Sequence, residues 1–196
     1  MDDIIQRQFP TVLAPRFSEL EPMTESGERF VLAGDRLAFE VSRPWLHAVC
    51  TISETFKRPT PYGAGLPDGV TLRCGPIPKT LLDQFLDQAL TAYPCETAAW
   101  IVWSEEHREF VYILLRIVSA SNDHVEFERP LLQAGMHLVM DIHSHGAFPA
   151  FFSTQDDKDD KDQLCISAVV GKVNDPKPVI IARLSMLGVF YPLGEI

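Results

Sequence analysis

The sequence predicts a mixed α/β protein of the α+β type, with a small β-rich module ahead of a larger domain. Three observations predict it. The first 56 residues hold strand-like patterns, and a stretch rich in proline and glycine follows at residues 57–69. Beyond it, one clear helix, several apolar strands and a second helix alternate. We therefore predict an N-terminal module with its linker at residues 1–76 and a second domain at residues 77–196.

The N-terminal module is predicted to be built on a β-hairpin. Residues 1–25 contain three prolines and little periodicity, which predicts an extended arm. Residues 29–33 and 36–41 form two strand-like runs around a turn at Gly34-Asp35. Residues 45–52 predict a third strand. None of these segments has recognisable chemistry, so we expect the module to pack on the second domain or to recognise a partner.

The second domain is predicted to begin with a helix at residues 80–90. Its apolar side chains recur at helical spacing, Thr80 with Asp83 forms a variant of the capping box, and Pro94 ends it. The remaining elements share an apolar or alternating pattern and are predicted as strands at residues 97–103, 109–117, 122–128, 165–170 and 179–184, with a final strand or tail at 188–196.

Composition bounds the location and the partners. The formal net charge of −10 argues against nonspecific nucleic-acid binding, and no apolar run is long enough to span a membrane. Acidic residues at Asp2 and Asp3 stand where a signal peptide would have positive charge, so we expect a cytoplasmic protein. The four cysteines are widely spaced and predict neither a zinc knuckle nor a disulfide framework. They are Cys50, Cys74, Cys95 and Cys165.

Two histidines follow a predicted buried strand. The apolar run at residues 138–142 predicts this strand, and His143 and His145 come directly after it. On a strand, residues i and i+2 point to the same side, so both rings are expected to face one point in space. Packed or exposed histidines are the alternative, and the pair alone leaves the two interpretations about equally favoured.

A second part of the pattern follows seven residues later. If a helix begins at Ser153, then Ser153 and Asp156 lie one turn apart on the same face. This is also a helix N-cap pattern, and the two interpretations are compatible because the same first turn presents Asp156 to a metal. Two imidazoles and one carboxylate are three of the four ligands of a catalytic zinc, which leaves one position for water. The acidic run at residues 156–162 lacks the glycine and the closing glutamate of a calcium loop.

The pattern His143-x-His145, seven residues, Ser153-x-x-Asp156 resembles the JAMM motif of the JAB/MPN/Mov34 metallopeptidases. That family also has an upstream glutamate, in a Pro-x-Glu segment after a helix and at the start of a strand. Glu96 matches in position and context. The resemblance covers the predicted second domain and implies the mixed β-sheet flanked by helices of that family. More narrowly, the N-terminal region resembles the A-protein family of bacterial PRTRC systems.

The resemblance implies zinc chemistry. His143, His145 and Asp156 would be the protein ligands, and zinc lowers the pKa of its water to about 7. Glu96 would be the general base that later passes the proton to the leaving amine, and Ser153 would hydrogen-bond the oxyanion. Spacing alone does not select this glutamate over its neighbours Glu105, Glu106, Glu126 and Glu128.

The resemblance also implies a substrate class. We expect a zinc-dependent metallopeptidase or isopeptidase that acts on a ubiquitin-like or sulfur-carrier protein, with a ThiF- or E1-like protein as a possible partner and neither nucleic acid nor membrane. The alternative is a non-catalytic scaffold or binding module of the same fold in a ThiF-associated system. Such relatives have usually lost motif residues, whereas this chain keeps all five.

Two departures from the family pattern bear on the substrate. Gly146 stands where many members have proline, and the connecting loop is unusually aromatic, with Phe148, Phe151 and Phe152. Both leave the metal chemistry intact and the substrate preference open. Metallo-β-lactamase, cupin and amidohydrolase sites fit poorly, because the residues that each requires after His-x-His are missing here.

Overall fold

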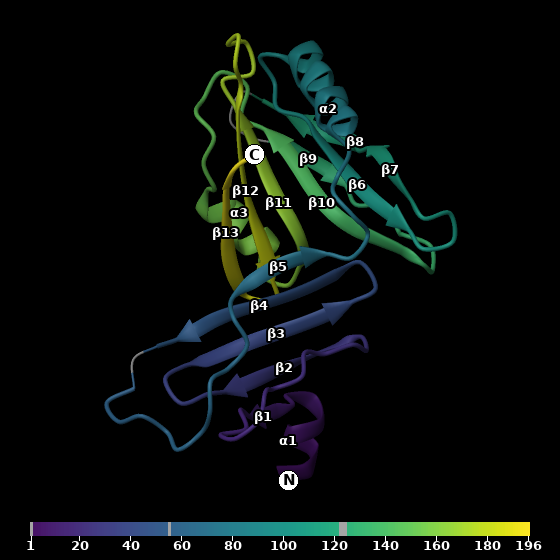
Figure 1. The fold of residues 1–196 in the computed structure, drawn as a ribbon. Helices are drawn as coiled ribbons and strands as arrows, with labels where there is room; N and C mark the ends of the chain where they lie inside the picture. The colour runs from purple at the N-terminus through teal and green to yellow at the C-terminus, as the bar shows by residue number, and fades with distance from the viewer. Residues whose placement is uncertain (1, 55, 122–124) are drawn as a thin grey trace. The chain divides into compact units, whose positions relative to one another are not determined.

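The computed structural model describes residues 2–54, 56–121 and 125–196, and the chain divides into two compact units, Met1–Gly75 and Pro76–Ile196 (Figure 1). The described residues form three helices and thirteen strands, which confirms the mixed α/β class with a β-rich N-terminal module. Within these residues, no helix combines the length and the apolar character needed to cross a membrane.

The first unit contains one five-stranded sheet. In spatial order its strands are β1 (Thr11–Leu13), β2 (Gly27–Leu32), β3 (Leu37–Arg43), β4 (Leu46–Ser53) and β5 (Gly69–Leu72). β1 pairs with β2 in parallel, and the other pairs are antiparallel. The predicted hairpin and third strand are therefore confirmed.

The predicted extended arm is wrong over its first residues, because Asp2–Gln8 form a helix, α1. The acids Asp2 and Asp3 in the first turn and Arg7 in the last turn complement the helix dipole. This charge pattern, without any buried side chain, is the local signal that favours the helix.

A buried carboxylate lies on the core face of the first sheet. Glu40 on β3 is fully buried and accepts hydrogen bonds from Arg29 Nε (2.5 Å) and from the backbone N–H of Met23 (2.7 Å). His47 Nε2 lies 2.9 Å from the same side chain. By strand alternation this network shares its face with the apolar core residues Ala38 and Val49.

The second unit is built on a six-stranded sheet. Its strands in spatial order are β13 (Val189–Glu195), β12 (Val179–Met186), β11 (Leu164–Gly171), β10 (Met136–Ser144), β6 (Ala98–Ser104) and β7 (Glu109–Leu114). β10 and β11 are parallel, and the other pairs are antiparallel. Because β10 lies between β11 and β6, its C-terminal end is paired with a strand on each side.

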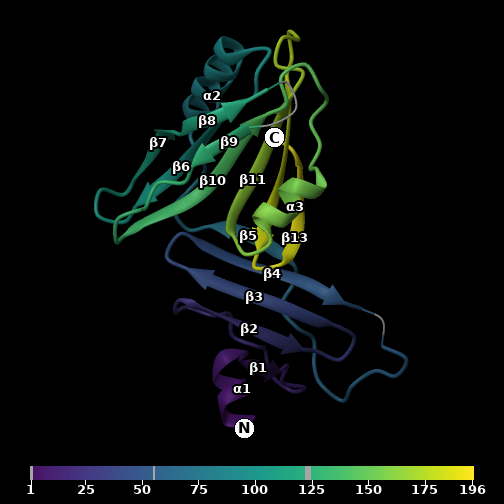
Figure 2. The same ribbon diagram turned by 180° about the vertical axis from the view of Figure 1, so that it is seen from behind.

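A separate two-stranded sheet consists of β8 (Arg116–Ala120) and β9 (Val125–Glu128). The strand predicted at residues 109–117 is thus divided, with the buried Leu115 between its two parts. Residues 122–124 of another predicted strand lie outside the described residues, and β9 forms the rest of it. Figure 2 shows this pair of strands and helix α3 (Thr154–Asp160) in front of the six-stranded sheet.

Helix α2 (Lys79–Ala92) confirms the predicted helix but begins one residue early. Its N-cap is Pro78, which makes no side-chain capping bond, so the predicted Thr80–Asp83 capping box is wrong. Thr80 lies inside the first turn, and the carboxylate of Asp83 instead pairs with Lys79. Helix α3 begins where predicted, with Ser153 as its N-cap.

Candidate metal centre

Strand β10 delivers the two histidines. His143 lies within the strand and is paired with Ala98 of β6 on one side and Val169 of β11 on the other. His145 follows the strand, and its backbone N–H donates to the carbonyl of Val170 at 2.8 Å. Hydrogen bonds to both neighbouring strands therefore fix the backbone that presents the two rings.

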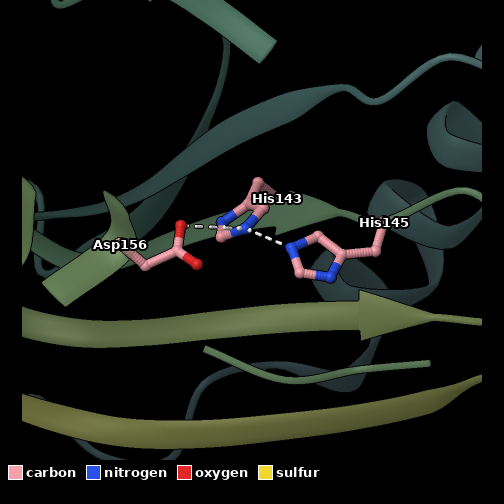
Figure 3. Close-up of side chains that lie close together, drawn as sticks. All are labelled: His143, His145 and Asp156. Carbon is pink, nitrogen blue, oxygen red and sulfur yellow. Dashed lines mark hydrogen bonds and ion pairs between the residues drawn. The ribbon is translucent and has the colours of Figure 1, made fainter. Parts of the chain in front are cut away.

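The two rings and one carboxylate converge. His143 Nε2 lies 3.1 Å from His145 Nε2 and 3.4 Å from Asp156 Oδ1, as Figure 3 shows. One ligand atom from each of these residues lies within 4.8 Å of the other two. His145 is 6% exposed, and the side chains of His143 and Asp156 are 17% and 19% exposed. The three groups therefore face one another in a largely dehydrated space.

The far side of His145 sets its tautomer. Its Nδ1 lies 3.3 Å from the carbonyl oxygen of Pro149, so Nδ1–H donates there and the Nε2 lone pair points into the cluster. The ring of Phe151 packs edge-on against the same imidazole, with ring centroids 4.7 Å apart. Backbone and aromatic contacts thus orient this ring for ligation through Nε2.

Burial lowers the pKa of both imidazoles below the usual histidine value. The effect of burial exceeds that of the Asp156 carboxylate, which raises the pKa of His143 and His145. Both rings are therefore neutral at pH 7. Neutral imidazole is the form that binds a metal ion, so no proton has to be displaced at that pH.

The two carboxylate oxygens of Asp156 have different partners. The backbone N–H of Ser153 donates to Asp156 Oδ2 at 2.6 Å, and the backbone N–H of Asp156 donates to Ser153 Oγ at 3.2 Å. Oδ1 faces the histidines. The capping and metal interpretations are thus compatible in one geometry. The Ser153 hydroxyl accepts one hydrogen bond and keeps its own proton to donate.

The fifth predicted residue, Glu96, lines a cavity together with the other four. Glu96 lies two residues before β6 and is 6% exposed, and its backbone N–H donates to Ser121 O at 2.9 Å. A cavity of about 740 Å³ is lined by all five predicted site residues, which are Glu96, His143, His145, Ser153 and Asp156. Of the four glutamates that spacing left open, only Glu126 on β9 also lines it.

Sequence reasoning missed other residues of the cavity wall. Asp141 precedes His143 by two residues on β10, so strand alternation could have placed it on the same face. Burial, reinforced by the nearby Asp160, raises the pKa of Asp141 to about 7. Arg129 and Phe127 reach the cavity from the β9 segment, and no local pattern indicates this.

The donor set fits zinc. Two imidazole nitrogens and one carboxylate oxygen are a common ligand set for catalytic zinc, with a fourth position left for water or substrate. The cavity beside His143, His145 and Asp156 provides space for that fourth ligand. A central strand presents two histidines, and the following helix presents a carboxylate to the same point. These features define a protein with a candidate site for a single metal ion.

The chain belongs to the family of prokaryotic homologs of the JAB domain, which residues 78–185 match. This confirms the family that the motif predicted. Residues 1–73 match a domain of unknown function, DUF2016. No curated protein matches the chain. Among solved structures, protein DSY2949 from Desulfitobacterium hafniense has 19% sequence identity and a TM-score of 0.42, and the match covers 54% of this chain and 80% of that chain.

Proposed function

We propose that this protein is a zinc-dependent metallopeptidase that hydrolyses an amide bond at the C-terminus of a bacterial ubiquitin-like protein. One observation supports the metal chemistry above all. His143, His145 and Asp156 present one ligand atom each to a common point, in a cavity that Glu96 and Ser153 also line. The substrate class is supported by membership of the JAB-domain family.

Nε2 of His143, Nε2 of His145 and Oδ1 of Asp156 would hold the ion. When bound, zinc supplies a Lewis acid and lowers the pKa of a bound water molecule. The lowered pKa of both imidazoles keeps their lone pairs available at neutral pH. The hydrogen bond from His145 Nδ1 to Pro149 O would hold that ring in place as it ligates.

Glu96 would accept the proton of the attacking water and pass it to the departing amine. The amide C–N bond then breaks and leaves a carboxylic acid and a neutral amine. The proton of the acid then passes to the amine, so the products are a carboxylate and an ammonium group, and protons and atoms balance. Ser153 would donate its free hydroxyl proton to the oxyanion of the tetrahedral intermediate. Loss of one such donor typically lowers kcat by about 10²–10³.

The proposed partners follow from the family. A ubiquitin-like or sulfur-carrier protein would supply the C-terminal amide, and a ThiF- or E1-like protein, which activates such C-termini, is the partner that we propose. The narrower resemblance of the N-terminal region to the A proteins of PRTRC systems supports the same kind of partner. Residues 1–73 match a domain of unknown function, and this match suggests no activity for the N-terminal module.

The experiment begins with the metal content of untagged protein purified without chelator, compared with His143→Ala. We expect near-stoichiometric zinc in the parent and little in the variant. Hydrolysis is then measured on a bacterial ubiquitin-like protein that has a fluorogenic amide at its C-terminus. Glu96→Gln should retain zinc and lose hydrolysis, whereas Glu126→Gln, which changes another glutamate of the same cavity, should retain both.

Each step can fail separately. A parent that stays free of zinc even after zinc is added back would favour the non-catalytic scaffold. A Glu96→Gln variant with full activity would remove that residue from the role of general base. Zinc without hydrolysis of the C-terminal amide would leave the metal centre standing and reject the substrate class.

A further inference from the structure

An arginine outside the predicted site holds helix α3. Arg183 lies on β12 and is 7% exposed. Its Nη1 donates to Asp157 Oδ1 at 2.5 Å, and its Nη2 donates to Asp160 Oδ2 at 2.7 Å. The two aspartates are three residues apart and lie on one face of α3. One guanidinium therefore bridges the first and the last turn of the helix that contains Asp156.

The flat faces of the same guanidinium hold the chain just before the helix. Its carbon lies 4.0 Å from the ring centroid of Phe152 and 3.9 Å from that of Phe190 on β13. Phe152 directly precedes Ser153, the N-cap of α3. Arg183 thus contacts the chain on both sides of Asp156, while Phe190 fixes the guanidinium from the sheet.

Helix α3 has no apolar side chain of its own to pack against the sheet. It is only seven residues long, and isolated helices of this length are marginal in water. Asp159 and Asp160 stand at its C-terminal end, where the helix dipole disfavours negative charge. Asp160, which bonds Arg183, is its buried residue, so no apolar stripe anchors the helix. The contacts of one arginine take the place of that stripe.

We propose that Arg183 is a positioning residue for the metal centre, which holds α3 so that Asp156 Oδ1 faces the two histidines. The inference rests on the proposed function in one respect, namely that His143, His145 and Asp156 take a metal. Arginine suits this position because its rigid fork donates to two carboxylates while its faces stack on two rings. Lysine keeps the charge but cannot make both contacts.

The test measures metal binding rather than hydrolysis. Zinc affinity is determined by competition with a chromogenic chelator, and Co²⁺ is added to record its visible spectrum, for the parent, Arg183→Lys and Asp156→Asn. We expect Arg183→Lys to lose about tenfold or more in zinc affinity, as for other residues that orient metal ligands. Its Co²⁺ spectrum should shift toward that of Asp156→Asn, because the carboxylate ligand is displaced.

Two further variants separate positioning from folding. Arg116→Lys makes the same change at an exposed arginine paired with Glu128 and should leave affinity and spectrum unchanged. Asp157→Asn replaces the more exposed partner of Arg183, keeps the bond to Asp160, and should give an intermediate loss of affinity. All measurements are made below the onset of thermal unfolding of the metal-free variants, so that only folded protein is compared.

The outcomes are distinct. Parental affinity and spectrum in Arg183→Lys would overturn the positioning role, whatever the activity. A parent that binds neither zinc nor Co²⁺ would overturn both the proposed function and this inference. Metal binding that depends on Arg183 in a protein without hydrolytic activity would reject the proposed function alone and support the positioning role.

Discussion

Ser144 and Thr97 exchange two hydrogen bonds in the interior of the second unit. The backbone N–H of Ser144 donates to Thr97 O at 2.9 Å, and the backbone N–H of Thr97 donates to Ser144 Oγ at 3.1 Å. Both residues are buried. Ser144 stands between His143 and His145, and Thr97 follows Glu96. The exchange therefore ties the proposed metal ligands to the proposed general base.

Ser144→Ala is expected to misplace Glu96 while leaving the metal ligands in place. The substitution removes the acceptor of the Thr97 N–H, and an unsatisfied buried donor costs about 1–3 kcal/mol of stability. Hydrolysis of the C-terminal amide should fall by about tenfold to a hundredfold, because small displacements of a catalytic group have such effects. Zinc content should stay at the parental level, as elemental analysis would show.

Ser185→Ala is the matched control for this prediction. Ser185 is also a fully buried serine, and its Oγ lies 2.8 Å from Ser167 Oγ. Its loss should lower the free energy of unfolding but leave hydrolysis unchanged. Equal activity in Ser144→Ala and Ser185→Ala would show that the Ser144–Thr97 exchange does not position the base.

Gly146→Ala is expected to destabilise the second unit. Gly146 has φ +53°, and a Cβ built there would lie 2.6 Å from the carbonyl oxygen of Pro94, two residues before Glu96. Left-handed backbone costs a non-glycine residue about 1–2 kcal/mol, and the clash adds to it. A proline at this position is excluded, because its φ is fixed near −65°. Chemical unfolding would measure the loss.

The control for Gly146 is a glycine with positive φ and free space. Gly194 has φ +84°, and a Cβ there would meet nothing within 4 Å. Gly194→Ala should therefore show the conformational cost without the clash. If the two variants lose the same free energy of unfolding, the close approach of Gly146 to the Pro94 carbonyl is not a constraint.

The parts of the site that sequence could predict are those that depend on neighbouring residues. Strand alternation brings the rings of His143 and His145 to one side, and the capping pattern places Ser153 and Asp156 on one turn. Glu96 lies far away in sequence and reaches the cavity through the pairing of β6 with β10. Its prediction therefore required the family resemblance.

The failures of prediction have the same physical origin. Arg183 gave no local signal, because its role depends on a helix, a loop and a strand that meet only in the folded unit. At α2, Pro78 occupies the N-cap position, so Thr80 lies two positions inside the helix and cannot cap it. The role of Arg183 thus depends on tertiary contacts, and the start of α2 depends on the direction in which the chain enters the helix. Local preference predicts neither.

Glu40→Ala is expected to destabilise the first unit strongly. Glu40 is fully buried and is bonded to Arg29 at 2.5 Å, with His47 at 2.9 Å. Removal of one partner of a buried ion pair leaves the other charge uncompensated, which typically costs about 3–5 kcal/mol. Glu128→Ala breaks an exposed pair with Arg116 and should cost less than about 1 kcal/mol. A loss of similar size in both variants of the full chain would contradict this account.

Asp141→Asn is expected to change stability in a pH-dependent way. Burial raises the pKa of Asp141 from about 3.8 in the unfolded chain to about 7 in the folded chain. The folded state therefore binds this proton more tightly, and the associated stability is present at low pH and is lost as pH rises through 7. Asparagine does not ionise, so the metal-free variant should gain stability relative to the parent as pH increases.

The measurement compares the free energies of unfolding of metal-free parent and Asp141→Asn at pH 5 and pH 8. The difference between them should shift by about 1–3 kcal/mol in favour of the variant at pH 8. The lowered pKa of His143 and His145 gives the opposite slope, since stability falls as pH drops below 6.5, but both proteins share it and it cancels in the difference. A difference that is constant between pH 5 and pH 8 would mean that the Asp141 carboxyl ionises as readily in the folded protein as in the unfolded chain.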